Sequence, residues 1–152
     1  MKRLLIASLA LVAFYAPVVA QNRGNDLSSL VKGYYAAWNT LNPDNAAKYY
    51  AKDADLVFYD IAPLKYAGGW KEYSETFKKD VAPGFTSLVL TPGNDLKVTR
   101  KGNIALATLT FHLAAKQKDG QALEFDARHT MVWEKRGARW LIIHEHISKP
   151  LF

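Results

Sequence analysis

The sequence predicts an α+β fold in which helices cover one face of a curved, mostly antiparallel β-sheet. Two observations lead to this fold class. Apolar residues in the first part of the chain recur every three or four positions, as on the buried side of a helix. After Pro83 the chain alternates apolar and polar residues, and short turns containing Gly or Pro separate the alternating segments. Helices followed by a run of strands are typical of α+β domains.

Three helices are expected before most of the sheet. The first spans residues 27–42 and is preceded by Asp26, a good N-cap residue. Its apolar stripe consists of Leu27, Leu30, Val31, Tyr34, Trp38 and Leu41. A second, short helix covers residues 43–53, since proline is favoured at the first helical position. A third helix is expected over residues 69–83, where Pro83 ends it.

Six strands are expected around the third helix. The first, residues 56–60, precedes that helix and is rich in aromatic and β-branched side chains. The other five follow it in direct succession, at residues 85–92, 95–102, 103–117, 122–136 and 138–150. Turns between successive strands are short, so neighbouring strands are expected to pair antiparallel.

A secretory signal peptide is expected at residues 1–20, followed by a single domain at residues 21–152. The chain starts Met-Lys-Arg, continues with an uncharged apolar run and reaches Val-Val-Ala at residues 18–20. This run of about 13 residues is shorter than the roughly 20 that a membrane-spanning helix needs. We therefore expect cleavage after Ala20, a periplasmic or secreted location, and no stable membrane insertion of the mature chain.

Composition argues against several classes of function. Removal of Lys2 and Arg3 with the signal peptide lowers the formal net charge from +6 to +4, and the basic residues are scattered. Nucleic-acid-binding domains usually concentrate them on one face, so no nucleic-acid partner is expected. The chain has no cysteine, and its hydrophobic fraction of 49% must stabilise the fold through packing. No nucleophile elbow, phosphate loop or dinucleotide fingerprint occurs, so no cofactor is expected.

Both ends of the mature chain resemble the nuclear transport factor 2-like superfamily, and within it the SnoaL-like domains. At the front the resemblance lies in YYAAWNTLNPDNAAKYYAKDADLVFYD, and at the back in TMVWEKRGARWLIIHEHIS. It covers nearly all of the mature chain. It implies a cystatin-like cone, in which a strongly bent sheet wraps the helices and leaves a pocket at the wide end. Members of the superfamily include isomerases, cyclases, dehydratases, epoxide hydrolases and binding modules, and many are homodimers.

The resemblance to ketosteroid isomerases points to two candidate catalytic residues. Tyr34 matches a tyrosine that donates a hydrogen bond to a developing oxyanion, although a tyrosine in an apolar stripe can also be core. Asp60 lies two residues after Phe58, which occupies the position of the general base. Residues two apart on a strand share a face, so Asp60 is a candidate base. The alternative is that Asp60 starts a turn.

Two histidines lie on the predicted central strands. The association domain of calcium/calmodulin-dependent kinase carries a pocket-lining residue at the position of Met131, so His129, Met131 and Trp133 are expected to line the cavity. His129 could act there as an acid, a base or a hydrogen-bond donor. His112 belongs to a polar line on the preceding strand and is a candidate ligand contact. For both histidines the alternative is a surface or dimer-interface position.

The stretch WLIIHEHIS raises the question of a metal site. Strict alternation places Trp140, Ile142, His144, His146 and Ser148 on one face and Leu141, Ile143, Glu145 and Ile147 on the other. Two histidines alone do not meet the ligand number that zinc needs, so no metal is expected. Glu145 is a candidate catalytic carboxylate on the pocket face. Alternatively it pairs with Arg128, Arg139 or a lysine across the sheet.

The expected function is the binding of a small apolar organic molecule, with cofactorless acid–base chemistry such as isomerisation, dehydration or lyase-type cleavage. In this reading Tyr34, Asp60, His129 and Glu145 carry the chemistry. The side chains expected to contact the ligand are Trp38, Phe58, Trp70, His112, Met131 and Trp133. The alternative is a non-catalytic periplasmic ligand-binding or dimerisation module, and a homodimer is expected in either case.

Overall fold

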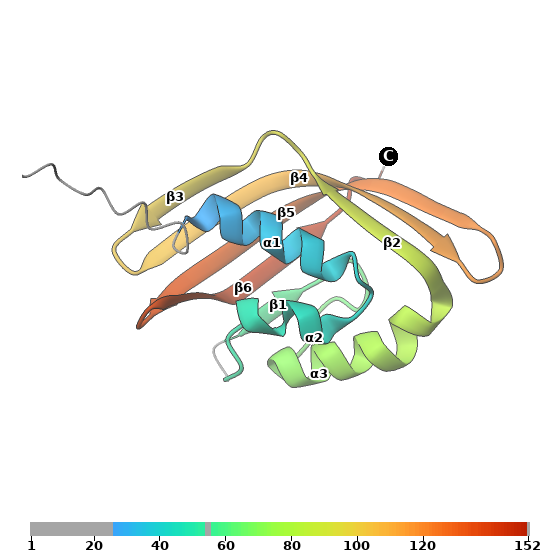
Figure 1. Cartoon of the computed structure of the whole chain (residues 1–152), viewed down its shortest axis with the longest axis horizontal. Helices are drawn as coiled ribbons and strands as arrows, with labels where there is room; N and C mark the ends of the chain where they lie inside the picture. Colours follow the sequence, from blue (N-terminus) through green and yellow to red (C-terminus); the bar gives the residue numbers. More distant parts are fainter. Residues whose placement is uncertain (1–25, 54–55, 152) are drawn as a thin grey trace, which may run out of the picture.

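A computed structural model describes residues 26–53 and 56–151 and confirms the α+β fold (Figure 1). The predicted signal peptide at residues 1–20 lies outside the described residues. The elements in chain order are α1 (Leu27–Trp38), α2 (Pro43–Ala46), η1 (Ala47–Tyr49), β1 (Val57–Tyr59), α3 (Gly69–Thr76), η2 (Phe77–Val81), η3 (Ala82–Gly84), β2 (Phe85–Pro92), β3 (Lys97–Lys101), β4 (Ile104–Gln117), β5 (Ala122–Arg136) and β6 (Arg139–Ser148). Within the described ranges, no helix is long and apolar enough to cross a bilayer.

The six strands form one curved sheet that does not close on itself. The strand order is β1-β6-β5-β4-β2, and β3 also pairs with β4, at the opposite end of that long strand from β2. The pairing of β1 with β6 is parallel, whereas all other pairs are antiparallel. Figure 1 shows the sheet arching over the helices, so its inner face meets them and its outer face does not.

Helix α1 lies across the inner face of the sheet. Its N-cap is Asp26, whose carboxylate accepts a hydrogen bond from the backbone N–H of Ser28 at 3.1 Å. Its buried side chains are Leu27, Val31, Tyr34, Tyr35, Ala37 and Trp38. The apolar stripe that the sequence predicts for this helix is therefore largely its buried face, and Tyr35 adds to that face.

The third predicted helix is interrupted. Residues 69–76 form a regular α-helix, after which η2 widens to a π turn, where the N–H of Ala82 bonds to the carbonyl oxygen of Phe77. Proline lacks an N–H, and its ring clashes with the carbonyl four residues earlier, so regular helix cannot continue through Pro83. The widened turn directs Phe77 and Val81 toward the same cavity as α3.

A β-bulge in β6 changes which side chains face the core. His144 is opposite Val132, but Ile142 is opposite Trp133, so Ile143 is an extra residue in the ladder. The strict alternation predicted for this strand is therefore wrong before the bulge. Ile142, 0% exposed, shares the inner face with Glu145 instead of with His144.

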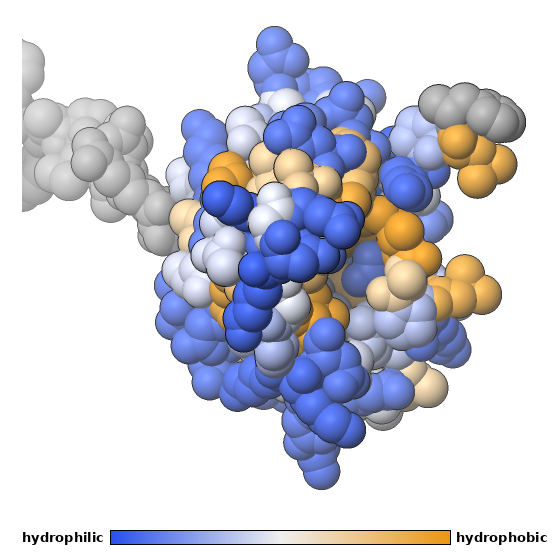
Figure 2. Space-filling view, turned by 90° about the vertical axis from the view of Figure 1, so that its right-hand side faces the viewer, coloured by the Kyte–Doolittle hydropathy of each residue, from blue (hydrophilic) through white to orange (hydrophobic). Residues whose placement is uncertain are grey.

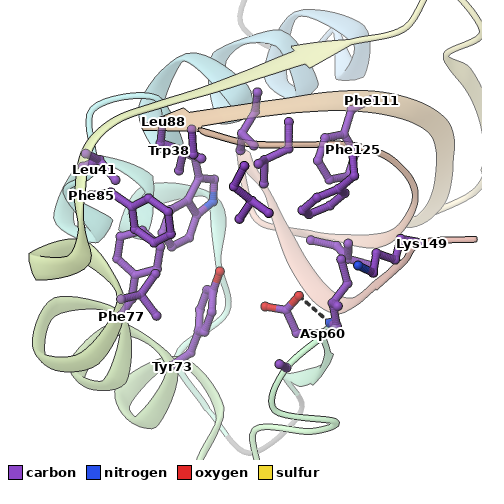
Figure 3. Close-up of a pocket in the computed structure, with 18 of the residues that line it drawn as sticks. Trp38, Leu41, Asp60, Tyr73, Phe77, Phe85, Leu88, Phe111, Phe125 and Lys149 are labelled. Atoms are coloured by element: carbon purple, nitrogen blue, oxygen red, sulfur yellow. Dashed lines mark hydrogen bonds between the residues drawn. The ribbon is translucent and has the colours of Figure 1, made fainter. Parts of the chain in front are cut away.

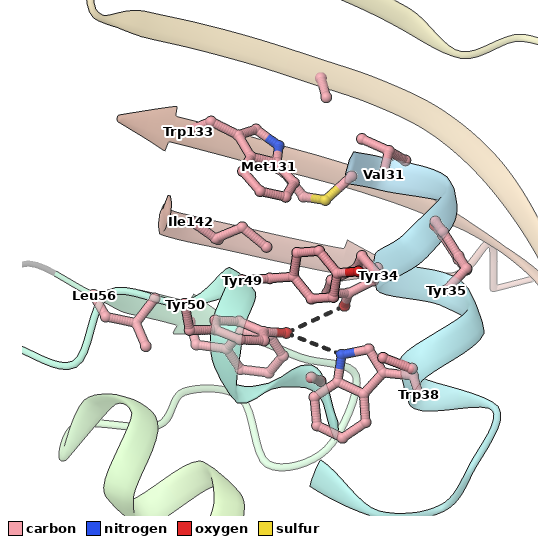
Figure 4. Close-up of a cluster of buried hydrophobic side chains, with 14 of the residues drawn as sticks. Val31, Tyr34, Tyr35, Trp38, Tyr49, Tyr50, Leu56, Met131, Trp133 and Ile142 are labelled. Atoms are coloured by element: carbon pink, nitrogen blue, oxygen red, sulfur yellow. Dashed lines mark hydrogen bonds between the residues drawn. The ribbon is translucent and has the colours of Figure 1, made fainter. Parts of the chain in front are cut away.

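Aromatic side chains make up much of the core between the helices and the inner face (Figure 4). The Trp38 ring lies 5.3 Å from the ring of Tyr73 and 6.3 Å from that of Tyr50, measured between centroids. The Trp38 indole N–H donates to the Tyr50 hydroxyl at 3.2 Å. Rigid rings with few rotatable bonds define the space beside them well, and a pocket is left at one end of this core.

Candidate functional site

A pocket of about 430 Å³ lies between α1, α3, η2 and β2 on one side and the ends of β4, β5 and β6 on the other. Figure 2 shows this side of the molecule hollowed, with hydrophobic residues around the hollow. Most of its lining is aromatic or aliphatic. The few polar side chains in the lining are Tyr34, Asp60, Tyr66, Tyr73 and Lys149.

Asp60 supplies a carboxylate to this apolar pocket (Figure 3). It follows β1, which runs parallel to β6 with Tyr59 opposite His146, so Asp60 enters the pocket beside Ile147. Burial raises the pKa of Asp60 to about 6, and the charge of Glu145 adds to this rise. The backbone N–H of Ile61, which donates to Asp60 Oδ1 at 2.7 Å, opposes the rise only in part.

Tyr73 of α3 is a polar pocket residue that the sequence reasoning missed. Its side chain is 7% exposed, its hydroxyl has no hydrogen-bond partner among the described residues, and Figure 3 shows that hydroxyl directed into the pocket. Burial holds the pKa of Tyr73 well above its ordinary value, and the charge of Asp60 raises it further. The phenol therefore stays protonated beside the carboxylate. One signal was present, since Tyr73 lies one helical turn from both Trp70 and Phe77.

Behind the pocket wall, Glu145 and His129 form a fully buried pair. Glu145 is 0% exposed and His129 is 1% exposed. Glu145 Oε1 lies 3.0 Å from His129 Nε2 and accepts a hydrogen bond from the Tyr34 hydroxyl. His129 Nδ1 is 2.8 Å from the Tyr35 hydroxyl, whereas Nε2 makes no hydrogen bond of good geometry among the described residues despite its closeness to Glu145. Neither His129 nor Glu145 is part of the pocket lining.

The Tyr34 hydroxyl is occupied by this buried network. It donates its only proton to Glu145 and accepts a hydrogen bond from Tyr50 at 3.3 Å. Tyr34 is nevertheless part of the pocket lining. Its hydroxyl, however, could donate to a ligand only after breaking the bond to Glu145. Tyr73, unlike Tyr34, directs into the pocket a hydroxyl that has no hydrogen-bond partner among the described residues.

Of the six predicted ligand contacts, only Trp38 lines the pocket. Phe58 packs behind the pocket wall, with its ring centroid 4.2 Å from that of Tyr73. The ring centroid of Trp70 lies 4.4 Å from that of Tyr50. Met131 and Trp133, both 0% exposed, lie farther along β5 in the core and do not reach the pocket (Figure 4).

The structure places His112, a predicted ligand contact, away from the pocket, because its side chain projects from the outer face of β4. Its imidazole is 47% exposed, and Nδ1 lies 2.9 Å from a carboxylate oxygen of Asp126 on β5. Alternation directs His112 away from its two neighbours Phe111 and Leu113, which both line the pocket.

His144 and His146 lie on the outer face of the sheet, and both of their rings lie close to the Tyr59 ring. The centroid distances from that ring are 5.8 Å and 6.0 Å. Burial lowers the pKa of His144, and a neighbouring His146 lowers it further. The described part of the chain contains no group of three histidine or carboxylate side chains placed to hold a metal ion.

Comparison with known proteins gives a consistent assignment of the fold. A family model described as SnoaL-like domain matches residues 27–152. A nuclear transport factor 2-like superfamily protein from Salmonella enterica superposes with a TM-score of 0.75 and 22% identity, covering 83% of this chain and 89% of its own. A candidate scytalone dehydratase from Novosphingobium aromaticivorans superposes with a TM-score of 0.73 and 9% sequence identity, and 85% of each chain is covered. A hexachlorocyclohexane dehydrochlorinase superposes with a TM-score of 0.68 and 13% sequence identity, covering 83% of this chain and 88% of its own. A search of curated proteins found no match.

Proposed function

This chain belongs to the SnoaL-like domain family, and on that premise we propose that its pocket binds a small apolar organic molecule from which Asp60 removes a proton without a cofactor. The observation that carries the proposal is the position of Asp60, a carboxylate with a pKa of about 6 in a largely apolar pocket. A base works best when its pKa lies near the working pH and water is excluded around it.

The size and lining of the pocket fit a ligand of one or two rings. A volume of about 430 Å³ lies in the range of pockets that enclose small organic molecules. The aromatic walls formed by Trp38, Phe77, Phe85 and Phe111 would contact such a ligand mainly through apolar surface. The polar groups of Asp60 and Tyr73 would then fix its orientation.

The reaction class that this pair of groups supports is elimination. The carboxylate of Asp60 takes a proton from carbon, the C–H electrons form a double bond, and the leaving group departs with its own bonding electrons. The Tyr73 hydroxyl donates a hydrogen bond to the oxygen or halide that leaves. Two proteins of the same fold carry names for such chemistry, a dehydratase and a dehydrochlorinase. Isomerisation would use the same first step, with the proton returned to another carbon.

A Kemp elimination tests for a base of this kind without knowledge of the natural substrate. In nitrobenzisoxazole a carboxylate removes the ring C–H proton, the N–O bond breaks, and a coloured cyanophenolate is released. We expect the purified mature protein to catalyse this reaction with a rate that rises with pH and is half-maximal near pH 6, where Asp60 ionises.

The matched variants are Asp60→Asn and Asp126→Asn. The first should reduce the rate by about 100-fold or more, as is typical when a general base is lost. The second removes a carboxylate from the outer face of the sheet and should leave the rate unchanged. Equal rates for the wild type and Asp60→Asn would disprove Asp60 as the base.

A non-catalytic ligand-binding or dimerisation module is the second candidate, favoured by the outer face of the sheet. Ile104 and Leu106 are each 41% exposed there, and Leu106 continues into a cross-strand row with Val132 and His144. We propose that this face forms a homodimer. Sedimentation should show a dimer for the wild type and a monomer for Leu106→Lys. A monomeric wild type at micromolar concentration would contradict this proposal.

We also propose that the protein is exported and that its signal peptide is removed after Ala20. The support is the basic start, the uncharged apolar run and the small residues before that position. Sequencing the N-terminus of protein from the periplasm or the medium should then begin at Gln21. Protein that is recovered only from the cytoplasm with Met1 intact would refute export.

A further inference from the structure

Lys149 places a cation at the wall of the pocket (Figure 3). The residue directly follows β6, so the last strand of the sheet fixes its backbone. Its Nζ lies 5.3 Å from the centroid of the Phe125 ring, and Phe125 also lines the pocket. An ammonium at this distance from a ring face is attracted by the negative face of the ring. The aromatic wall therefore helps to hold the charge at the pocket rim.

The charge of Lys149 has no carboxylate partner in the described part of the chain. Asp60, the other charged residue of the lining, does not form an ion pair with it. The two groups thus remain separately available to a ligand. A purely apolar ligand would contact neither charge favourably, whereas a ligand with an anionic group could pair with the ammonium and gain a charge-assisted hydrogen bond.

We propose that the ligand of this pocket is a small apolar monoanion, such as a carboxylate attached to a ring or a hydrocarbon chain. Its anionic group pairs with Lys149, its apolar part fills the cavity, and a carbon near the anionic group comes within reach of Asp60. Lys149 is then a specificity-determining residue, which selects anions over neutral molecules of the same shape. This inference rests on the proposed function, because it needs the pocket to bind small molecules.

The test uses two fluorescent probes with the same aromatic skeleton. Anilinonaphthalene sulfonate carries one negative charge, and phenylnaphthylamine is its neutral counterpart. Affinities of both are measured for the mature wild-type protein and for Lys149→Met, Lys149→Arg and Lys71→Met. The methionine variant keeps the apolar stem over Phe125 but removes the charge, and the arginine variant keeps the charge. Lys71 is an exposed lysine on α3 outside the pocket lining and is the matched control.

We expect Lys149→Met to weaken binding of the sulfonate by about threefold to tenfold, between the effect of an exposed ion pair and that of a charge-assisted hydrogen bond. Binding of phenylnaphthylamine should change by less than about twofold, because its contacts are apolar. Lys149→Arg and Lys71→Met should bind both probes as the wild type does. In competition, naphthoate or decanoate should displace the sulfonate probe better than the corresponding amide. Whichever of the two carboxylates competes better shows whether the pocket prefers a ring or a hydrocarbon chain.

Two results would overturn the inference in different ways. If phenylnaphthylamine binds but Lys149→Met leaves sulfonate affinity unchanged, or weakens both probes equally, the pocket takes apolar molecules without selecting anions. The proposed function would then survive and the anion selectivity would not. If neither probe binds the wild type, the pocket is not a ligand site, and both proposals are refuted.

Discussion

Asp60→Asn is expected to stabilise the protein at neutral and alkaline pH while it removes the proposed base. Asparagine has nearly the same shape, and its side-chain oxygen can still accept the hydrogen bond from the N–H of Ile61. What it lacks is a charge in the apolar pocket. A carboxylate that is costly to ionise in the folded state lowers stability, so its removal should raise the free energy of unfolding.

The magnitude and the pH window follow from the pKa of Asp60. The folded-state pKa is about 6, against an ordinary value of 3.8. This rise corresponds to about 3 kcal/mol at most, and partial solvent access reduces the expected effect on stability to roughly 1–2 kcal/mol. The folded protein holds this proton more tightly than the unfolded chain, so stability falls as pH rises from about 4 to about 6 and then stays lower. The stabilisation by Asp60→Asn should therefore be small at pH 4 and full at pH 8.

Urea unfolding of the wild type and Asp60→Asn at pH 4 and pH 8 measures this difference directly. At pH 8 the thermal midpoint should also rise by about 3–10 °C for a domain of this size. Asp95→Asn serves as a control, because hydrogen bonds from Thr110 lower the pKa of Asp95 and its charge is favourable in the folded state. That variant should be destabilised to a similar extent at both pH values. An Asp60→Asn effect that is equal at pH 4 and pH 8, or destabilising at pH 8, would refute the reasoning.

Three further substitutions test the pocket and the core behind it. Tyr73→Phe should keep the fold but slow the Kemp elimination by about tenfold, measured as kcat, because the leaving oxygen loses its donor; an unchanged kcat would exclude that role. Tyr34→Phe should lower the free energy of unfolding by about 1.5–3 kcal/mol, since Glu145 loses a hydrogen bond in a fully buried position. Urea unfolding measures this loss of stability, and a free energy of unfolding equal to that of the wild type would contradict the prediction. Gly33→Ala should destabilise by about 1–2 kcal/mol despite the higher helix propensity of alanine, because the added Cβ would collide with the hydroxyl of the buried Tyr49. A raised thermal midpoint would show that the Tyr49 side chain can move away.

The sequence alone determined the fold class and much of the inner surface of the sheet. Residue spacing is a local property, and a period of 3.6 or 2 records which side chains an element buries whatever partner covers them. The stripe on α1 and the inward direction of Glu145 could therefore be predicted. Asp60 could be proposed as a pocket residue because strand parity and the family resemblance agreed on its face.

Tertiary structure decided which polar groups meet the pocket and which meet each other. The bond between Tyr34 and Glu145 joins residues 111 positions apart, and no local pattern shows that it occupies the hydroxyl. The bulge at Ile143 reverses the alternation within β6 and brings Ile142 to the same face as Glu145. The Tyr73 hydroxyl reaches the cavity only because α3 packs beside it. These outcomes depend on how separate elements pack together, and packing is set by the whole chain rather than by the spacing of residues within one element.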